Sequence, residues 1–119
     1  MKRTLLLSLL ILVSCSKPIP KIDDVDLTVW KNDPKGCKGQ REQYVESLRE
    51  QHDKLKGLSE RDLTKLIGNP DRNDLSERHT KSYRYFIAPG PGCTGVDSIG
   101  LSLIIRFNAT GVSREVAIE

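Results

Sequence analysis

The sequence lacks the short motifs that carry common catalytic chemistry. It has no G-x-S-x-G, no glycine-rich phosphate loop and no H-E-x-x-H. We therefore expect a non-enzymatic chain that holds no cofactor and no metal. Its 19 Lys and Arg are interspersed with 16 Asp and Glu, without the dense basic stripe of a nucleic-acid-binding protein. No apolar run reaches the roughly 20 residues of a membrane-spanning helix.

The N-terminus does carry a distinctive pattern. Two basic residues precede an apolar run over residues 5–13, and polar residues follow Cys15. This layout is typical of a secretory signal peptide, here residues 1–14. Leu12-Val13-Ser14-Cys15 resembles the lipobox of bacterial lipoproteins. That resemblance implies cleavage between Ser14 and Cys15, diacylglycerol on the Cys15 sulfur and a membrane anchor. The alternative is a plain secreted protein in which Cys15 is incidental.

The chain has only three cysteines, which is an odd number. With Cys15 assigned to the lipid, Cys37 and Cys93 remain. In an oxidising envelope compartment two such cysteines most often form a disulfide. On the chain-entropy model, a bridge across so long a loop is worth about 4 kcal/mol. The competing interpretation is a metal site made of both cysteines, His52 and His79, but no ligand spacing supports it.

Composition divides the mature chain into two parts. Residues 15–26 read as a lipid-anchored tether, because prolines and charges over 16–26 oppose helix formation and packing. Extended, about ten such residues reach roughly 30–35 Å and would lift the domain off the lipid headgroups. Residues 27–119 read as a single globular domain. Within it Leu27–Trp30 is the first segment expected to pack, with Trp30 in the core.

Apolar residues at three- and four-residue spacing predict two helices. The first covers 40–56, and the second covers about 60–67, with Ser59 as N-cap and Gly68 as its end. The stripe of the first helix consists of Tyr44, Val45, Leu48, His52 and Leu55.

Beyond Pro70 the apolar period changes to two, which predicts strands over 82–88, 100–108 and 112–118. Residues 71–80 are ambiguous between a short edge strand and a loop. The expected fold is α+β. Two N-terminal helices pack on one face of a three-stranded antiparallel meander, and the opposite face is left to solvent. Tyr83, Tyr85 and Ile87 share one face of the first strand. Val112, Val116 and Ile118 share a face of the last strand, with Arg114 among them.

Three motifs in this order resemble the SmpA/OmlA (BamE-like) lipoproteins. Leu58-Ser59-x-x-Asp62-Leu63-x-x-Leu66-Ile67-Gly68-Asn69-Pro70 is similar to their "G-hydroxyl-x-x-x-V-x-x-x-L-G-x-P" element. Tyr83-Arg84-Tyr85 sits where they carry an aromatic "W-x-Y" strand. Leu103-Ile-Ile-Arg-Phe107-Asn108-Ala-Thr-Gly111-Val112 looks like their "L-x-L-x-F-x-x-x-G-V" hairpin.

The resemblance covers residues 57–118, and the β-lactamase-inhibitor-like fold shares the same unit. It implies an accessory of the outer membrane, such as a scaffold in β-barrel assembly or envelope integrity. The middle section, residues 30–41, is more similar to a family of small uncharacterised lipoproteins with a GC-[KN]-G-x-R segment and a paired downstream cysteine. Ser16 lacks the Asp that resembles an inner-membrane retention signal, which favours the outer membrane.

Two surfaces are candidates for binding an envelope protein. The first is the polar sheet face, where Arg84, Phe86 and Arg106 could form a patch. The strand propensity of aromatic residues is the favoured explanation of Phe86, and a solvated sheet face explains the patch equally well. The second is the Gly/Pro loop around Cys93, with Pro91 and Thr94, which would act as an inhibitor-like or ligand-capturing element. Asp97-Ser98-Ile99 in that loop also resembles the O-glycosylation sites of some envelope proteins.

Overall fold

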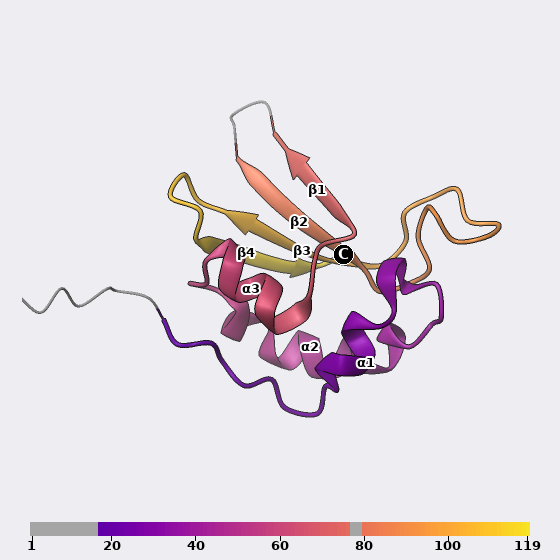
Figure 1. Ribbon diagram of the computed structural model, residues 1–119, viewed down its shortest axis with the longest axis horizontal. Coiled ribbons are helices and arrows are strands. Elements are labelled where there is room, and N and C mark those ends of the chain that lie inside the picture. The colour runs from indigo at the N-terminus through magenta and orange to yellow at the C-terminus, as the bar shows by residue number, and fades with distance from the viewer. Residues whose placement is uncertain (1–16, 77–79) are drawn as a thin grey trace, which may run out of the picture.

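The computed structural model describes residues 17–76 and 80–119, which form a helical layer on one face of an antiparallel sheet (Figure 1). The α-helices are α1 (Leu27–Lys31), α2 (Val45–Gln51) and α3 (Glu60–Ile67), and short 3-10 helices are η1 (Pro34–Gly36), η2 (Arg41–Tyr44) and η3 (His52–Leu55). The strands are β1 (Arg72–Leu75), β2 (Lys81–Phe86), β3 (Ser102–Phe107) and β4 (Ser113–Ile118), paired in the order β1-β2-β3-β4. The predicted α+β class is confirmed.

The sheet has four strands, so the prediction of a three-stranded meander is wrong. The additional strand, β1, comes from the ambiguous segment and pairs with β2, with Asp74 opposite Ser82. β1 adds little to the core, and Leu75 is 68% exposed. Backbone pairing rather than burial holds this edge strand. Its sequence therefore has no apolar alternation by which to recognise it.

The helix predicted over residues 40–56 is divided into η2, α2 and η3. The division between α2 and η3 falls at Gln51, whose backbone has φ −117° and ψ 6°. The Gln51 side-chain amide donates to the carbonyls of Ser47 and Asp23. The predicted apolar stripe nevertheless faces the core. Tyr44, Leu48 and Leu55 are buried, and Val45 and His52 are half-buried.

The second predicted helix is confirmed as α3. The Ser59 hydroxyl accepts a hydrogen bond from the Asp62 backbone N–H at 3.2 Å, which caps the first turn. Gly68 ends the helix with φ +85°, a conformation that favours glycine. The core-facing residues are Leu63, Leu66 and Ile67.

The alternation of facing residues on β2 and β3 is confirmed, but the expectation that the far face is left to solvent is wrong on β3, where Ser102 is 0% and Ile104 is 4% exposed. Tyr83, Tyr85 and Ile87 are buried beneath the helices together with Leu103, Ile105 and Phe107. On β4 the prediction that Val112 faces the core is wrong, because Ser113 takes that position. A bulge lets Ser113 pair with Phe107 while Glu115 pairs with Arg106, which leaves Arg114 extra. The bulge turns Ser113 inward, and its hydroxyl donates to the Leu55 carbonyl at 2.6 Å.

Residues 17–26 pack against the helices, contrary to the expectation that this stretch resists packing. Ile22 is 6% exposed and Val25 is 9% exposed, and both belong to the core. The packed unit therefore begins before residue 27. Pro18 and Pro20 still oppose helix formation, and a turn at residues 23–24, with Asp24 at φ +59°, separates the two buried residues.

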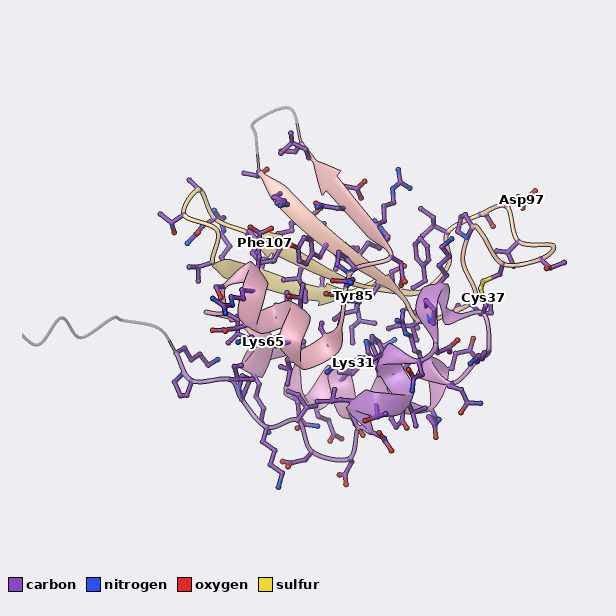
Figure 2. The ribbon with its side chains drawn as sticks, in the orientation of Figure 1. Lys31, Cys37, Lys65, Tyr85, Asp97 and Phe107 are labelled. Atoms are coloured by element: carbon purple, nitrogen blue, oxygen red, sulfur yellow. A yellow bond between two sulfur atoms is a disulfide. The ribbon has the colours of Figure 1, made fainter. Side chains whose placement is uncertain are left out.

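The helix α1 follows directly on this extended segment. The Asp26 carboxylate accepts the backbone N–H groups of Thr28 and Val29, which caps the helix. Trp30, 1% exposed, enters the core as predicted. Lys31 reaches α3, where its Nζ donates to the Lys65 carbonyl at 2.7 Å (Figure 2).

Candidate binding surfaces

A buried arginine organises the end of the sheet nearest α1. Arg41 is 2% exposed, and its Nη1 lies 2.6 Å from Asp71 Oδ2. Nη1 also donates to the Phe86 carbonyl, and Nε donates to the Trp30 carbonyl. The guanidinium lies 4.7 Å from the centre of the Trp30 ring. One side chain thus joins α1, the entry to β1 and the end of β2.

Two buried carboxylates complete this network. Asp71 accepts the backbone N–H of Lys35 on Oδ1 at 2.8 Å and that of Phe86 on Oδ2 at 2.8 Å. Asp33 is fully buried and accepts the backbone N–H groups of Lys38, Gln40 and Arg41. Because hydrogen bonds within the fold already occupy both carboxylates, we assign this network a structural role and not a catalytic one.

Asp33, Arg41 and Asp71 were not predicted from the sequence as a cluster. Asp33 belongs to a turn by composition, and Arg41 is one of 19 basic residues. The only available signal was the similarity of residues 30–41 to a small lipoprotein family. The partner, Asp71, lies 30 positions away from Arg41 in a polar segment. A buried ion pair between two such residues has no local sequence pattern.

Gly36 places this segment directly on the strand that follows. Its φ is +66°, and a Cβ there would lie 2.9 Å from the carbonyl oxygens of both Phe86 and Ile87. Only glycine permits this approach in this conformation. The turn at η1 therefore packs its backbone against the exit of β2.

Cys37 and Cys93 form a disulfide, with Cα atoms 5.4 Å apart, as predicted. It connects the segment after η1 to residues 87–101, the connection between β2 and β3, which we call the stapled loop. The Gly90 N–H donates to the Lys35 carbonyl at 3.0 Å, and the N–H groups of Ile87 and Ala88 donate to the Leu101 carbonyl. The base of the loop is thus fixed at several points.

The tip of the stapled loop is exposed. Asp97 lies at the far end of the loop, away from the helices and the sheet (Figure 2). Thr94, Ser98 and Ile99 are also exposed, and Ile99 is 38% accessible although apolar. Connections between neighbouring antiparallel strands usually need only about 2–5 residues, so the length of this loop is not required by the fold.

The predicted patch on the open face, the face of the sheet opposite the helices, is only partly formed. Arg84 and Arg106 share this face, as predicted. Phe86 also points to this side but is 4% exposed. Gly90 lies so close to its ring that a Cβ would overlap it. The prediction that Phe86 contacts a partner is therefore wrong, because the stapled loop covers it.

The two arginines of the open face differ in their surroundings. Arg106 lies 3.1 Å from Glu115 and 3.2 Å from Glu119, both on the adjacent edge of the sheet. Arg84 is half-buried opposite Arg72, which itself pairs with Asp74. Among the described residues Arg84 makes no ion pair. Arg84 is therefore the more available of the two cations.

The chain matches no protein-family model, and no curated protein or solved structure is significantly similar to it. The surfaces are therefore interpreted from their own geometry. Ser14 and Cys15, the predicted cleavage and lipidation site, lie outside the described residues. In residues 17–76 and 80–119 no helix is long and apolar enough to cross a membrane. The same ranges hold no cluster of three His, Cys, Asp or Glu side chains suited to a metal ion.

Two shallow cavities lie beside the sheet. One, of about 280 Å³, lies between the two hairpins and includes Arg106, Arg114 and Glu115 in its lining. The other, of about 260 Å³, lies between α2 and the edge strand β4, and is lined by Arg49, His52, Val116, Ala117 and Ile118. Neither cavity contains the Arg41–Asp71 network, which agrees with a structural role for that network.

Three of the titratable groups with shifted pKa values, Glu60, Tyr83 and Tyr85, connect the two layers. Hydrogen bonds from Lys81 and Tyr83 lower the pKa of Glu60 on α3. Burial, followed by the hydrogen bond to Glu60, raises the pKa of Tyr83 to about 12. Burial also raises the pKa of Tyr85, whose hydroxyl donates to the Gly68 carbonyl at 2.8 Å. These groups stabilise the contact of α3 with β2.

Proposed function

We propose that the chain is a non-enzymatic lipoprotein of the bacterial cell envelope that binds a protein partner through the tip of the stapled loop. The observation that carries this proposal is the contrast between the two ends of the loop. Its base is held by the Cys37–Cys93 disulfide and by backbone hydrogen bonds, whereas residues 94–100 project into solvent. A loop on a rigid base loses little conformational entropy when it binds.

Lipidation of Cys15 is part of this proposal and rests on the lipobox resemblance, with the outer membrane favoured by Ser16. Intact-mass analysis of the mature N-terminal peptide tests it. We expect a peptide that begins at Cys15 and carries diacylglycerol and an acyl chain. An unmodified Cys15 would contradict the anchor but would leave the stapled loop as a binding element of a secreted protein.

The chemistry of the tip indicates the kind of contact. Ile99 is an exposed apolar side chain next to the hydroxyl of Ser98 and the carboxylate of Asp97. A narrow projection of this composition suits a cleft on a partner, in the manner of an inhibitor loop. An interface of this type takes most of its affinity from a few residues in its centre.

The open face is a second candidate, because Arg84 makes no ion pair with a described residue. In this alternative the protein is a scaffold in outer-membrane assembly or integrity, as the SmpA/OmlA resemblance implies. The unit comparable to that family would be α3 followed by β2, β3 and β4, with β1 as an additional strand. An acidic surface on the partner would then meet Arg84.

Copurification of the partner with charge-reversal variants separates the two candidates. We expect Asp97→Lys combined with Ile99→Asp to abolish recovery, and Arg84→Glu to leave it unchanged. Arg61→Glu is the matched control, since Arg61 is exposed on the helical layer. Loss of the partner with Arg84→Glu alone would favour the open face. Equal recovery with all variants would overturn both.

A further inference from the structure

We propose that residues 17–21 dock the domain directly on the membrane that carries the lipid anchor, with the stapled loop facing away from it. This inference rests on the proposed lipidation of Cys15 and adds an orientation to it. Two observations support it. The chain contacts the helical layer close to the anchor, and the side chains exposed there suit a lipid surface.

Lys17, two positions after Cys15, already contacts the helical layer through its side chain. Lys17 Nζ donates to the Lys54 carbonyl at 2.9 Å and to the Lys56 carbonyl at 2.7 Å. These carbonyls lie at the end of η3, where a cation is favoured. Two residues of fully extended chain span at most about 7 Å. The lipid-bearing residue is therefore separated by at most about 7 Å of chain from a residue that contacts the helical layer.

Asp23 ties the chain to the helical layer a second time. The Asp23 N–H donates to Gln51 Oε1 at 2.7 Å, and Gln51 Nε2 donates back to the Asp23 carbonyl at 2.7 Å. Lys54 Nζ contacts Asp23 Oδ2 at 3.3 Å. With Ile22 and Val25 buried, residues 17–26 form a strap along α2 and η3. The strap holds the body at the anchor, where a free linker would let it swing.

The exposed side chains of the strap suit a lipid surface. Ile19 is 45% exposed between Pro18 and Pro20, and Lys17 and Lys21 flank this triplet. Apolar residues beside basic ones are typical of segments that lie in the headgroup region. Ile19 would enter the acyl boundary and Lys21 would contact lipid phosphates. The partner of this surface is thus a bilayer containing anionic lipid.

The proposed docking fixes the direction of the stapled loop. The start of the described chain and the loop lie at opposite ends of the molecule (Figure 1). If the strap lies on the bilayer, the tip near Asp97 points away from it. A partner in the aqueous space can then reach the tip without competing with the membrane.

Energy transfer to acceptor dyes on lipid headgroups tests this orientation. A donor dye is placed at residue 56 or at residue 97 through a click-reactive amino acid, which leaves the disulfide untouched. The lipidated protein is incorporated into vesicles of phosphatidylglycerol and phosphatidylcholine. We expect severalfold more efficient transfer from residue 56 than from residue 97. Equal transfer from the two positions would overturn the proposal.

Two further variants separate docking from anchoring. A flexible Gly/Ser insertion of about 12 residues between Ser16 and Lys17 gives the body a true tether. We expect part of the difference in transfer to persist, because residues 17–21 can still dock. Equal transfer would show that the short connection alone sets the orientation and would contradict the docking. Ile19→Asp is expected to reduce the difference. Leu75→Asp, which changes a still more exposed apolar residue on β1, is expected to leave it unchanged.

A synthetic anchor tests the docking independently of whether the natural protein is lipidated. The Cys15 thiol of an unlipidated chain can be coupled to a maleimide phospholipid in the vesicle, because Cys37 and Cys93 are already joined. If the natural protein carries no lipid but the coupled protein shows unequal transfer, only the native anchor is wrong. Equal transfer in the coupled protein would overturn the docking itself.

Discussion

Arg41 and Asp71 form a buried ion pair, with Nη1 and Oδ2 2.6 Å apart and side chains only 2% and 4% exposed. The pair joins residues that are 30 positions apart and positions the segment that carries Cys37. Asp71 also accepts two backbone N–H groups, so removal of the arginine would leave a buried carboxylate without its counter-ion. We therefore expect this pair to contribute strongly to the stability of this end of the molecule.

Arg41→Met is expected to lower the free energy of unfolding by about 3–5 kcal/mol, which is typical when one partner of a buried pair is removed. The matched variant is Arg106→Met, which breaks the exposed pairs with Glu115 and Glu119 and is expected to cost no more than about 1 kcal/mol. Urea denaturation of both variants measures the difference. Similar losses in the two variants would contradict the role assigned to Arg41.

The disulfide is expected to stabilise the fold without being required for it. The paired substitution Cys37→Ser with Cys93→Ser removes a bridge across 56 positions and should cost about 4 kcal/mol on the chain-entropy model. Because the Arg41 network remains, we expect a folded protein with faster hydrogen exchange at Gly90 and Val96. Loss of cooperative unfolding in this variant would show that the network alone cannot hold the fold.

Gly36 and Gly39 provide a matched comparison that tests the close approach of η1 to the end of β2. Both have positive φ, +66° and +70°, but a Cβ at Gly39 would meet no atom within 4 Å. Gly39→Ala should cost only the conformational penalty of about 1–2 kcal/mol. Gly36→Ala should cost clearly more, because backbone carbonyls must move. Equal midpoints in urea for the two variants would refute the close packing.

The pKa of Glu60 predicts a pH dependence of stability. Since hydrogen bonds from Lys81 and Tyr83 lower this pKa below its usual 4.5, ionised Glu60 stabilises the folded state above that pH. The contribution should disappear as the pH falls through the lowered pKa. Glu60→Gln is therefore expected to be less stable than the parent at pH 7 and to approach it as the pH falls below the lowered pKa. A constant difference across that range, measured by urea denaturation, would contradict this linkage.

Local patterns predicted much of the fold. The Ser59 cap and Gly68 located α3, and the alternation around Tyr85 and Ile105 located β2 and β3. Local signals failed where long-range contacts decide the structure. Backbone pairing alone creates β1, and a bulge turns Ser113 inward. The strap packs because α2 and η3 lie beside it. The prolines and charges of the strap give no sign of this contact.

In the candidate site, too, local patterns were predictive and long-range contacts were not. The count of cysteines predicted the Cys37–Cys93 pair, and composition identified the loop around Cys93. The burial of Phe86 depends on Gly90 folding over its ring, a contact that strand alternation cannot predict. The ion pair of Arg41 and Asp71 was likewise out of reach, because neither residue has a local partner.

The central claim is that the tip of the stapled loop binds a protein partner, and photocrosslinking in cells tests it most directly. A benzophenone amino acid is placed at residue 99 on the tip, at residue 84 on the open face, or at residue 65 on the helical layer. We predict one discrete crosslinked protein from residue 99 and none from residue 65. A discrete product from residue 84 but not from residue 99 would contradict the claim, as would the same unselective products from all three positions.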